Sequence, residues 1–413
     1  MRISLPTYGS RGDVQPFVTL GACLRSRGHD VELAAPAEFA ALAEQAGLGF
    51  RALPGNPSAA LHRPEVVAAI RKGPSATRIG IAARKSGQSE EDDPVLVLGA
   101  MREAIEGADL VVANWMTKMA CLIGPEVPWC TLSTWARVPT RKFPAVGWPE
   151  LPLGGRYNLL SHKVWNALEW LPTRPVINRM RAAKDQPPLD KASPFRDTGR
   201  ERPVLLPFST EVLPRPADWP AAAHLTGFLF MDRDRPVDPA LADFVGTGAK
   251  PIVLTVGNLW HIYPEQEVVD TVVATARRAG RRVVLIGGGE EHADDDVFRA
   301  TEVDYRWLLS RSAAFVHHGG FGTTAEAVRA GVPQVVMPSF SDHPYMANLV
   351  HRAGVAVRPV PLTKLTERTL REALDACLND AALAERARAV GARVAAEDGV
   401  GTAVKVIENW AAK

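Results

Sequence analysis

Short apolar runs alternate with helix-like stretches along most of this chain, and this alternation limits the accessible folds more than any other feature. Residues 1–7 and 30–35 are strand-like apolar runs, and residues 14–27 between them carry apolar side chains at helical spacing. The same alternation continues with strand-like runs at 109–113, 128–132, 251–256, 281–286, 313–316 and 332–337. Strands that alternate with helices predict an α/β fold, with parallel sheets covered by helices on both faces.

The length of the chain predicts two such units. At 413 residues the chain exceeds the size at which a single hydrophobic core is usual. The charged, proline-containing segment 232–239 lies between the two blocks of strands and is the expected linker. We therefore expect a first domain over 1–228, a linker over 229–239 and a second domain over 240–413. The last helix, at about 401–412, is expected to pack back on the first domain.

Two segments interrupt the alternation. Residues 72–94 are rich in glycine, serine and charge, which predicts a surface loop with room for a short helix. Residues 135–170 are irregular and rich in aromatic side chains, which indicate core packing or a lid. Ligands of doubly wound sheets bind outside the carboxyl ends of the strands, so two facing units predict a site in the cleft between them.

The composition argues against several functional classes. A net charge of +2 gives no reason to expect nucleic acid or an acidic membrane as a partner. No secretory signal pattern is present, and no apolar stretch approaches the ~20 residues of a membrane helix. The cysteines form no CxxC pair, which is typical of a reducing cytosol and gives no metal site: Cys23, Cys121, Cys130 and Cys377. We therefore expect a cytoplasmic protein without an integral membrane segment.

The segment 316–326, Val-His-His-Gly-Gly-Phe-Gly-Thr-Thr-Ala-Glu, predicts a phosphate site. It follows a strand-like run and opens a helix-like stretch, where free backbone N–H groups and the helix dipole favour an anion. Glycines allow close approach of the backbone, and the threonine hydroxyls and the His318 ring add donors. His317 should point to the opposite face of the strand and have a structural role. The candidate phosphate contacts are His318, Gly319, Gly320, Gly322 and Thr323.

Asp13 is the candidate general base. It lies in the turn after the first strand-like run, where a carboxylate can take a proton from an acceptor hydroxyl. An alternative role is to cap the helix that begins at Val14, and the two roles are compatible. Ser10 and Gly12 shape the same loop, and Ser10 is expected either to position Asp13 or to contact a donor phosphate. The alternative for Ser10 is an ordinary turn residue.

Motifs at both ends of the chain carry a family resemblance. They are Thr-Tyr-Gly-Ser-Arg-Gly-Asp-Val-Gln-Pro at 7–16, Leu-Pro-Arg-Pro-Ala-Asp-Trp-Pro at 213–220 with Thr-Gly-Phe at 226–228, and the run 307–324 with its continuations at 330–338 and 341–345. Together they resemble the family 1-type inverting nucleotide-sugar glycosyltransferases of the GT-B fold, in the bacterial natural-product and sterol 3-β-glucosyltransferase-like branch. The resemblance is weak from about Arg51 to Arg200, where these enzymes bind their varied acceptors.

The resemblance implies a role for several motif residues. In this branch Asp13 is the base, and the N–H of His318 stabilises charge on the leaving nucleotide. Glu326 accepts hydrogen bonds from the two ribose hydroxyls, which favours a UDP-sugar over a deoxyribose donor. The alternative for Glu326 is an ordinary solvated helix residue.

The sugar-binding region both matches the family and departs from it. Asp342 matches a carboxylate that binds sugar hydroxyls in the family, and its alternative role is to cap a helix that begins near Pro344. His343 stands where the family usually has glutamine, which leaves the identity of the sugar open. The segment 255–260 lacks the usual Gly-Ser-Met motif, and Asn258 is the expected replacement donor to the phosphates.

The sequence thus predicts an inverting glycosyltransferase. It would move a sugar from a nucleotide sugar to a hydroxyl of an apolar small molecule, such as a secondary metabolite, a sterol or a polyketide. Trp115 and Trp135 are candidate acceptor contacts. No metal or other cofactor is expected, because backbone amides and His318 can cradle the diphosphate. Two rivals stay open, a nucleotide-sugar 2-epimerase of the same fold and a non-catalytic auxiliary protein. An auxiliary protein or a second copy of the chain also stays open as a partner.

Overall fold

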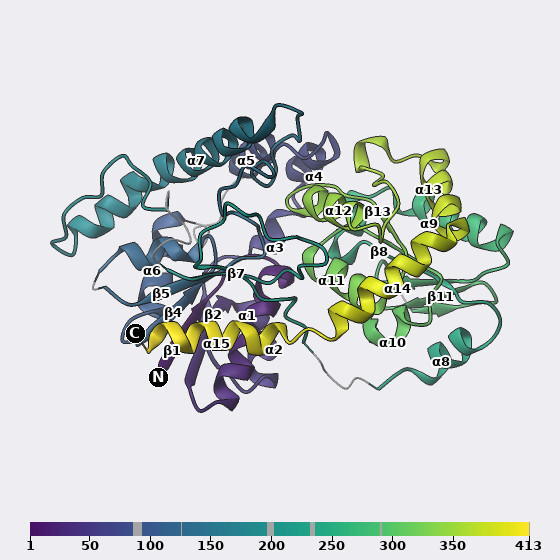
Figure 1. The fold of residues 1–413 in the computed structure, drawn as a ribbon, viewed down its shortest axis with the longest axis horizontal. Coiled ribbons are helices and arrows are strands. Elements are labelled where there is room, and N and C mark those ends of the chain that lie inside the picture. The colour runs from purple at the N-terminus through teal and green to yellow at the C-terminus, as the bar shows by residue number, and fades with distance from the viewer. Residues whose placement is uncertain (86–92, 125, 196–201, 232–235, 290, 413) are drawn as a thin grey trace.

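A seven-stranded parallel sheet forms the centre of the first half of the molecule (Figure 1). The computed structural model describes residues 1–85, 93–124, 126–195, 202–231, 236–289 and 291–412. The strands are β1 (Arg2–Pro6), β2 (Asp30–Pro36), β3 (Gly49–Leu53), β4 (Leu110–Ala113), β5 (Trp129–Leu132), β6 (Val204–Leu206) and β7 (Ala223–Leu225). They lie in the order β3-β2-β1-β4-β5-β6-β7, so the chain reverses its direction of growth beside β1.

A second sheet of six strands forms the centre of the other half. Its strands are β8 (Ile252–Thr255), β9 (Val283–Ile286), β10 (His292–Ala293), β11 (Val297–Ala300), β12 (Ala314–His317) and β13 (Gln334–Val336). Their order is β10-β11-β9-β8-β12-β13, and only the β10–β11 pair is antiparallel. Two sheets of this kind confirm the predicted α/β fold with two doubly wound, Rossmann-like domains.

Helices cover both sheets. In the first half they are α1 (Arg11–Ser26), η1 (Ala37–Phe39), α2 (Ala40–Gln45), α3 (Pro57–Ala60), α4 (Pro64–Arg71), α5 (Ala76–Lys85), α6 (Pro94–Ala104), η3 (Thr117–Leu122) and α7 (Gly154–Ala182). In the second half they are α8 (Pro239–Gly246), η4 (Gly257–Ile262), α9 (Glu265–Arg278), α10 (Tyr305–Leu309), α11 (Phe321–Ala330), α12 (His343–Arg352), η5 (Leu362–Lys364), α13 (Glu367–Asn379), α14 (Ala381–Ala395) and α15 (Gly399–Ala411).

The structure agrees with one prediction for the interrupting segments and contradicts the other. Residues 76–85 form α5, a short helix inside the segment predicted as a surface loop with room for one, while 86–92 lie outside the described residues. The segment 135–170, predicted to be irregular, contains the first half of α7, a helix of 29 residues. Pro172 and Pro175 lie inside this helix, although each removes a backbone donor.

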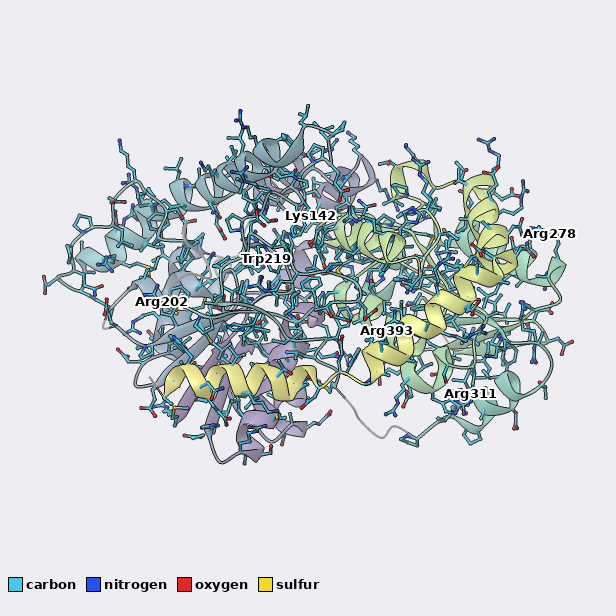
Figure 2. The ribbon with its side chains drawn as sticks, viewed as in Figure 1. Lys142, Arg202, Trp219, Arg278, Arg311 and Arg393 are labelled. Carbon is cyan, nitrogen blue, oxygen red and sulfur yellow. The ribbon has the colours of Figure 1, made fainter. Side chains whose placement is uncertain are left out.

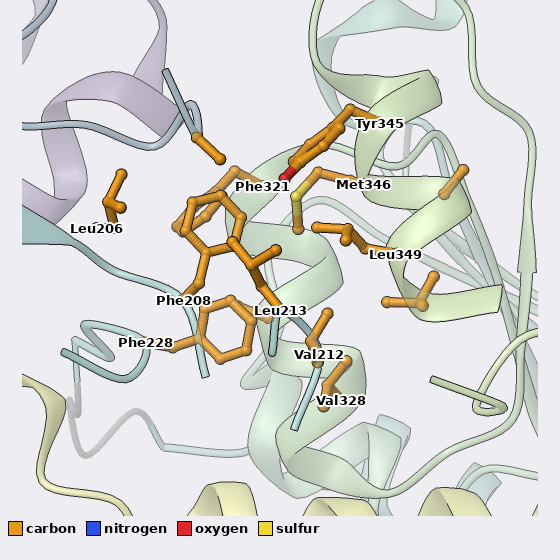
Figure 3. Packing of buried hydrophobic residues seen from close by; sticks show 14 of the residues in the cluster. Leu206, Phe208, Val212, Leu213, Phe228, Phe321, Val328, Tyr345, Met346 and Leu349 are labelled. Atoms are coloured by element: carbon orange, nitrogen blue, oxygen red, sulfur yellow. The ribbon is translucent and has the colours of Figure 1, made fainter. Parts of the chain in front are cut away.

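An apolar cluster joins the two domains (Figure 3). Phe208 and Phe228 of the first domain meet Phe321 of α11 edge to face, with ring centroids 5.1 and 5.7 Å apart. Tyr345 and Met346 of α12 close the same cluster and are buried. The contact fixes the start of α11, the helix behind the glycine-rich turn, against the first domain.

The last helix crosses from the second domain to the first (Figure 1). Val404 and Ile407 of α15 are fully buried in the cluster that contains α1 and β1 side chains. Arg393 lies at the end of α14 (Figure 2), and it pairs with Glu211 of the first domain at 2.7 Å. Part of the expected linker, 232–235, lies outside the described residues.

Candidate active site in the interdomain cleft

Asp13 lies in the first turn of α1, just past the carboxyl end of β1. Its Oδ2 accepts hydrogen bonds from the Ser10 N–H at 2.9 Å and from the Ser10 hydroxyl at 3.2 Å. The carboxylate therefore reaches back to the start of the helix, as in a capping interaction. Gly9 has a φ of +139°, and a Cβ added there would lie 2.3 Å from Asp13 Oδ2. Only glycine fits beside this carboxylate.

Asp342 of the second domain lies within electrostatic reach of Asp13. Burial raises the pKa of Asp13 to about 6, while the hydrogen bonds from Ser10 act in the opposite direction. Burial, followed by the negative charge of Asp13, raises the pKa of Asp342 to about 7. The charge of Asp13 thus acts on Asp342 across the domain boundary, where it disfavours ionisation of the Asp342 carboxyl.

Backbone strain accompanies Asp342. The preceding residue, Ser341, has a φ of +59°, a left-handed conformation that is uncommon for a residue with a Cβ. Asp342 stands at the N-cap position of α12, yet its side chain makes no capping hydrogen bond. The carboxylate instead accepts hydrogen bonds from its own N–H and from the Ser341 hydroxyl. Backbone strain of this kind is typical of functional sites.

The glycine-rich turn forms the second-domain wall of the cleft. Gly319 has a φ of +90°, and Gly320 is the N-cap of α11 without a capping side chain. A Cβ at Gly320 would lie 2.4 Å from Nε2 of His318, so the ring needs this glycine. Gly322 and Thr323 lie half-buried in the first turn of the helix, and a Cβ at Gly322 would meet open space. The turn offers backbone donors for an anion at this helix start.

His318 is a neutral imidazole beside this turn. Burial lowers its pKa to about 4. Its Nδ1 is buried and has no hydrogen-bond partner among the described residues. The ring of His343 lies edge-on against it at 4.9 Å, and His343 Nδ1 is 3.1 Å from the Ser339 hydroxyl. The structure thus places His343 behind His318, and a contact with the sugar stays a prediction.

His317 is held within the second domain. Its Nδ1 accepts a hydrogen bond from the Gly319 N–H at 3.1 Å, and its Nε2 lies 3.1 Å from Gln334 Oε1. Because Nδ1 accepts, Nε2 carries the proton that is donated to Gln334. His317 therefore has the structural role predicted for it, because its ring holds the Gly319 N–H of the glycine-rich turn.

The segment 255–260 lies against His318. Gly257 has a φ of +59°, and a Cβ there would lie 3.2 Å from His318 Cε1. The Thr255 hydroxyl donates to Ile286 O at 3.0 Å and accepts from the Gly257 N–H at 3.1 Å, which fixes the turn after β8. Asn258 follows directly and is exposed. Its amide is thus available for the predicted contact with phosphate.

Glu326 lies half-buried in α11 and has an internal partner. Arg329 donates to Glu326 Oε2 through Nη2 at 2.8 Å and through Nε at 3.2 Å. The guanidinium in turn stacks over Phe230 at 3.9 Å. The carboxylate is therefore not a solvated surface residue, and part of its acceptor capacity is already used.

Arg11 is a cleft residue that sequence reasoning missed. Burial raises the pKa of the Tyr305 phenol in α10 to about 12, and the charge of Arg11 acts in the opposite direction. Arg11 begins α1, two residues before Asp13, and its charge reaches Tyr305 of the second domain. Its place in the Gly-Ser-Arg-Gly-Asp loop, beside the candidate base, could have indicated this residue from the sequence.

A cavity of about 510 Å³ lies in the first domain on the sheet face around β5. Trp115, Trp129 and Phe195 supply its aromatic walls, and Lys118 and Arg137 line it as well. Asn114, the residue before Trp115, donates a hydrogen bond to Tyr8 O at 3.0 Å. The Trp115 wall of the cavity therefore lies beside the loop that carries Asp13. Such a volume suits an apolar small molecule.

Three tryptophans surround the guanidinium of Arg137. Its centre lies 4.2 Å from the Trp115 ring, 5.1 Å from Trp135 and 5.2 Å from Trp165. Glu169 accepts a hydrogen bond from Arg137 at 2.8 Å and lies 3.7 Å from Lys118 Nζ. Trp115 is therefore a cavity wall, whereas Trp135 supports Arg137 from beside it.

Two facing Rossmann-like domains, with a glycine-rich helix start on one side of the cleft and an aspartate on the other, define an enzyme of the GT-B class. The glycosyltransferase family 28 N-terminal domain matches residues 3–123. The erythromycin biosynthesis protein CIII-like C-terminal domain matches residues 287–408. The chain belongs to the GT-B glycosyltransferases of natural-product biosynthesis.

Relatives support this assignment. The chain is 46% identical over 416 residues to O-mycaminosyltylonolide 6-deoxyallosyltransferase of Streptomyces fradiae, covering 100% of this chain and 98% of that protein. It is 30% identical to a sterol 3-beta-glucosyltransferase of Arabidopsis thaliana, covering 98% of this chain and 65% of that protein. The epimerase and non-catalytic alternatives therefore lose their support.

Solved structures share the fold. The kitacinnamycin glycosyltransferase has a TM-score of 0.69 at 20% identity, covering 99% of this chain and 98% of that one. Glycosyltransferase VinC in complex with DTDP has a TM-score of 0.67 at 19% identity, covering 99% of both chains. Within the described ranges, no helix is long and apolar enough to cross a membrane.

Proposed function

We propose that this enzyme transfers a 6-deoxyhexose from a nucleoside diphosphate to a hydroxyl of a macrolide, with inversion at the anomeric carbon. One observation carries the proposal: Asp13 lies in the cleft with a raised pKa, opposite the glycine-rich turn. A carboxylate with a pKa of about 6 is a suitable general base near neutral pH. The name of the Streptomyces fradiae relative supports the class of sugar and acceptor.

The proposed chemistry is a single displacement. Asp13 takes the proton of the acceptor hydroxyl as its oxygen attacks the anomeric carbon. The bond from that carbon to the diphosphate breaks, and its electron pair leaves with the nucleotide. Backbone N–H groups at the start of α11 and an N–H of the neutral His318 receive the developing negative charge.

The nucleotide is proposed to be thymidine diphosphate, in place of the UDP expected from Glu326. Arg329 already occupies part of the Glu326 carboxylate, which reduces its capacity for two ribose hydroxyls. The solved structure of glycosyltransferase VinC holds thymidine diphosphate, which supports the same choice. Calorimetry with TDP and UDP decides between the two. Tighter binding of UDP would restore the original expectation.

The acceptor is proposed to bind in the cavity of the first domain, with Trp115 as a wall. We also propose that the diphosphate is held by amides and His318 without a metal. Activity should then persist when a chelator is added, and its loss would contradict this part of the proposal.

The direct test incubates the purified enzyme with a TDP-6-deoxyhexose or UDP-glucose and a panel of macrolides. Mass spectrometry identifies the product, and NMR gives its anomeric configuration. We expect a macrolide glycoside of inverted configuration. A retained configuration, or hydrolysis of the donor without transfer, would contradict the proposal.

A further inference from the structure

An arm of the first half of the chain is built into the second domain. The arm consists of residues 57–85, which include α3, α4 and α5. Val66 and Ile70 of α4 are 1% and 0% exposed, and they pack in the cluster that contains β8, β12 and α9 side chains. These two side chains therefore belong to the core of the domain that binds the donor.

The arm contacts one segment of that domain above all, η4. Arg71 donates hydrogen bonds from Nε to Ile262 O at 2.9 Å and from Nη2 to His261 O at 3.0 Å. The ring of His261 stacks on His62 with centroids 4.0 Å apart, and its Nε2 lies 3.0 Å from Leu61 O. The last turn of η4 is thus held by polar contacts from the arm.

The first turn of η4 lies against the donor site. Gly257 begins η4, and a Cβ there would be 3.2 Å from the ring of His318. Between the two ends, Trp260 donates to Ile286 O at 3.3 Å and packs over Gly288, where an added Cβ would lie 2.8 Å from the ring. A segment of only six residues therefore connects the Arg71 contacts with the His318 ring.

We propose that Arg71 is a positioning residue for the donor site. Its guanidinium bridges two adjacent carbonyl oxygens at the end of η4, and the short, tightly packed segment transmits this placement to Gly257. Gly257 in turn limits where the His318 ring can lie beside the glycine-rich turn. The arm thus lets the acceptor domain set the geometry of the diphosphate site, an inference that rests on the proposed function for the identity of the ligand.

The test compares Arg71→Ala with Lys72→Ala. Lys72 is the adjacent, exposed residue at the C-cap of α4, so it is a matched control. For Arg71→Ala we expect binding of TDP to weaken by roughly fivefold or more, the range typical of coupling between separate sites. The KM for the donor should rise by a similar factor, with a smaller change in kcat at saturating donor. Arg71→Lys, which keeps a charge and one donor group, should restore part of the affinity.

A second measurement needs no ligand. In protein labelled with ¹³C-histidine, Arg71→Ala should shift the ring signals of His318, and Lys72→Ala should leave them unchanged. Unchanged His318 signals together with unchanged TDP affinity would overturn the proposal, and a lowered melting temperature alone would show that the arm is only structural. If the wild type binds no nucleoside diphosphate, the proposed function fails, while the His318 signals still decide the role of Arg71.

Discussion

Asp13 and Asp342 show how single residues serve this cleft. Each follows a strand of a different sheet, and burial raises the pKa of both. Asp13 also accepts the Ser10 N–H, so the capping role and the proposed catalytic role coexist in one side chain. The proposed catalytic role requires the ionised form of Asp13, although burial makes that form costly.

The substitution Asp13→Asn removes the negative charge of this side chain and nearly keeps its shape. The amide oxygen can still accept the Ser10 N–H, so the turn should persist. We expect turnover to fall by roughly 10²–10⁴-fold, the usual contribution of a general base, with TDP affinity nearly unchanged. In the wild type kcat/KM should fall as the pH drops below about 6, because the base becomes protonated. A fully active variant would remove Asp13 from the mechanism.

Glu169 gives a second prediction for a single residue. It is the shared partner of Arg137 and Lys118, and the three side chains are 9–12% exposed. Glu169→Gln would leave two buried cations without their counterion, which should lower the free energy of unfolding by about 3–5 kcal/mol. Glu150→Gln, at an exposed pair with Arg352, should cost at most about 1 kcal/mol. Equal losses in urea titrations of the two variants would contradict this account.

The sequence could predict residues that directly follow buried strands, but not those joined across the chain. The alternation of strands and helices locates Asp13 and His318 at carboxyl ends of strands, without knowledge of tertiary contacts. Arg137 and Glu169 are 32 residues apart, and their pairing depends on α7, which the sequence did not predict. No local pattern indicates that a guanidinium will lie among three tryptophans.

At the scale of elements, α11 and α7 show opposite degrees of predictability. The turn before α11 can be predicted from local sequence, because glycines between a strand and a helix start are typical of an anion-binding turn. Helix α7 lacks such a signal, since Pro172 and Pro175 predict a break and its exposed leucines blur the apolar face. The arm shows the same limit, because nothing local marks Val66 and Ile70 as core residues of the other domain.

Gly322 provides a prediction for α11. A Cβ at this position meets open space and the helix would gain from alanine, so Gly322→Ala should stabilise the free protein by about 0.5–1 kcal/mol. If that open space is where the diphosphate lies, TDP affinity should fall. Gly80→Ala in α5, also facing open space, should give a similar gain with unchanged affinity. Unchanged TDP binding in Gly322→Ala would place the phosphates elsewhere.

At the scale of the whole molecule, three apolar contacts join the domains within the part of the chain that the structure describes. They are the aromatic cluster around Phe321, the arm in the second domain and α15 on the first domain. All three bury apolar side chains, so the interface resembles a core more than a loose hinge. The two sheets followed from local periodicity, whereas these three contacts join segments far apart in sequence.

Buried titratable groups predict how the stability of the whole molecule depends on pH. Burial lowers the pKa of five histidines, so above about pH 4 the unfolded state binds more protons than the folded state at these sites: His162, His224, His317, His318 and His343. Burial also raises the pKa of three carboxyls, so at these sites the folded state binds more protons than the unfolded state. They are Asp13, Asp342 and Glu397. Because the histidines outnumber the carboxyls, the free energy of unfolding should rise with pH from about 4 to about 6.5.

Urea titrations across this pH range measure how the free energy of unfolding changes with pH. The variant Asp342→Asn tests how much one buried carboxyl contributes to that change. Removing one carboxyl with a raised pKa removes a contribution that falls with pH, so the variant should show a steeper rise than the wild type. The difference should extend beyond about pH 7, where the Asp342 side chain is only half ionised in the folded protein. A flatter slope in Asp342→Asn would show that the pKa of Asp342 is not raised in the folded protein. A wild-type stability that falls between about pH 4 and about pH 6.5 would show that the histidines are not buried in their neutral form.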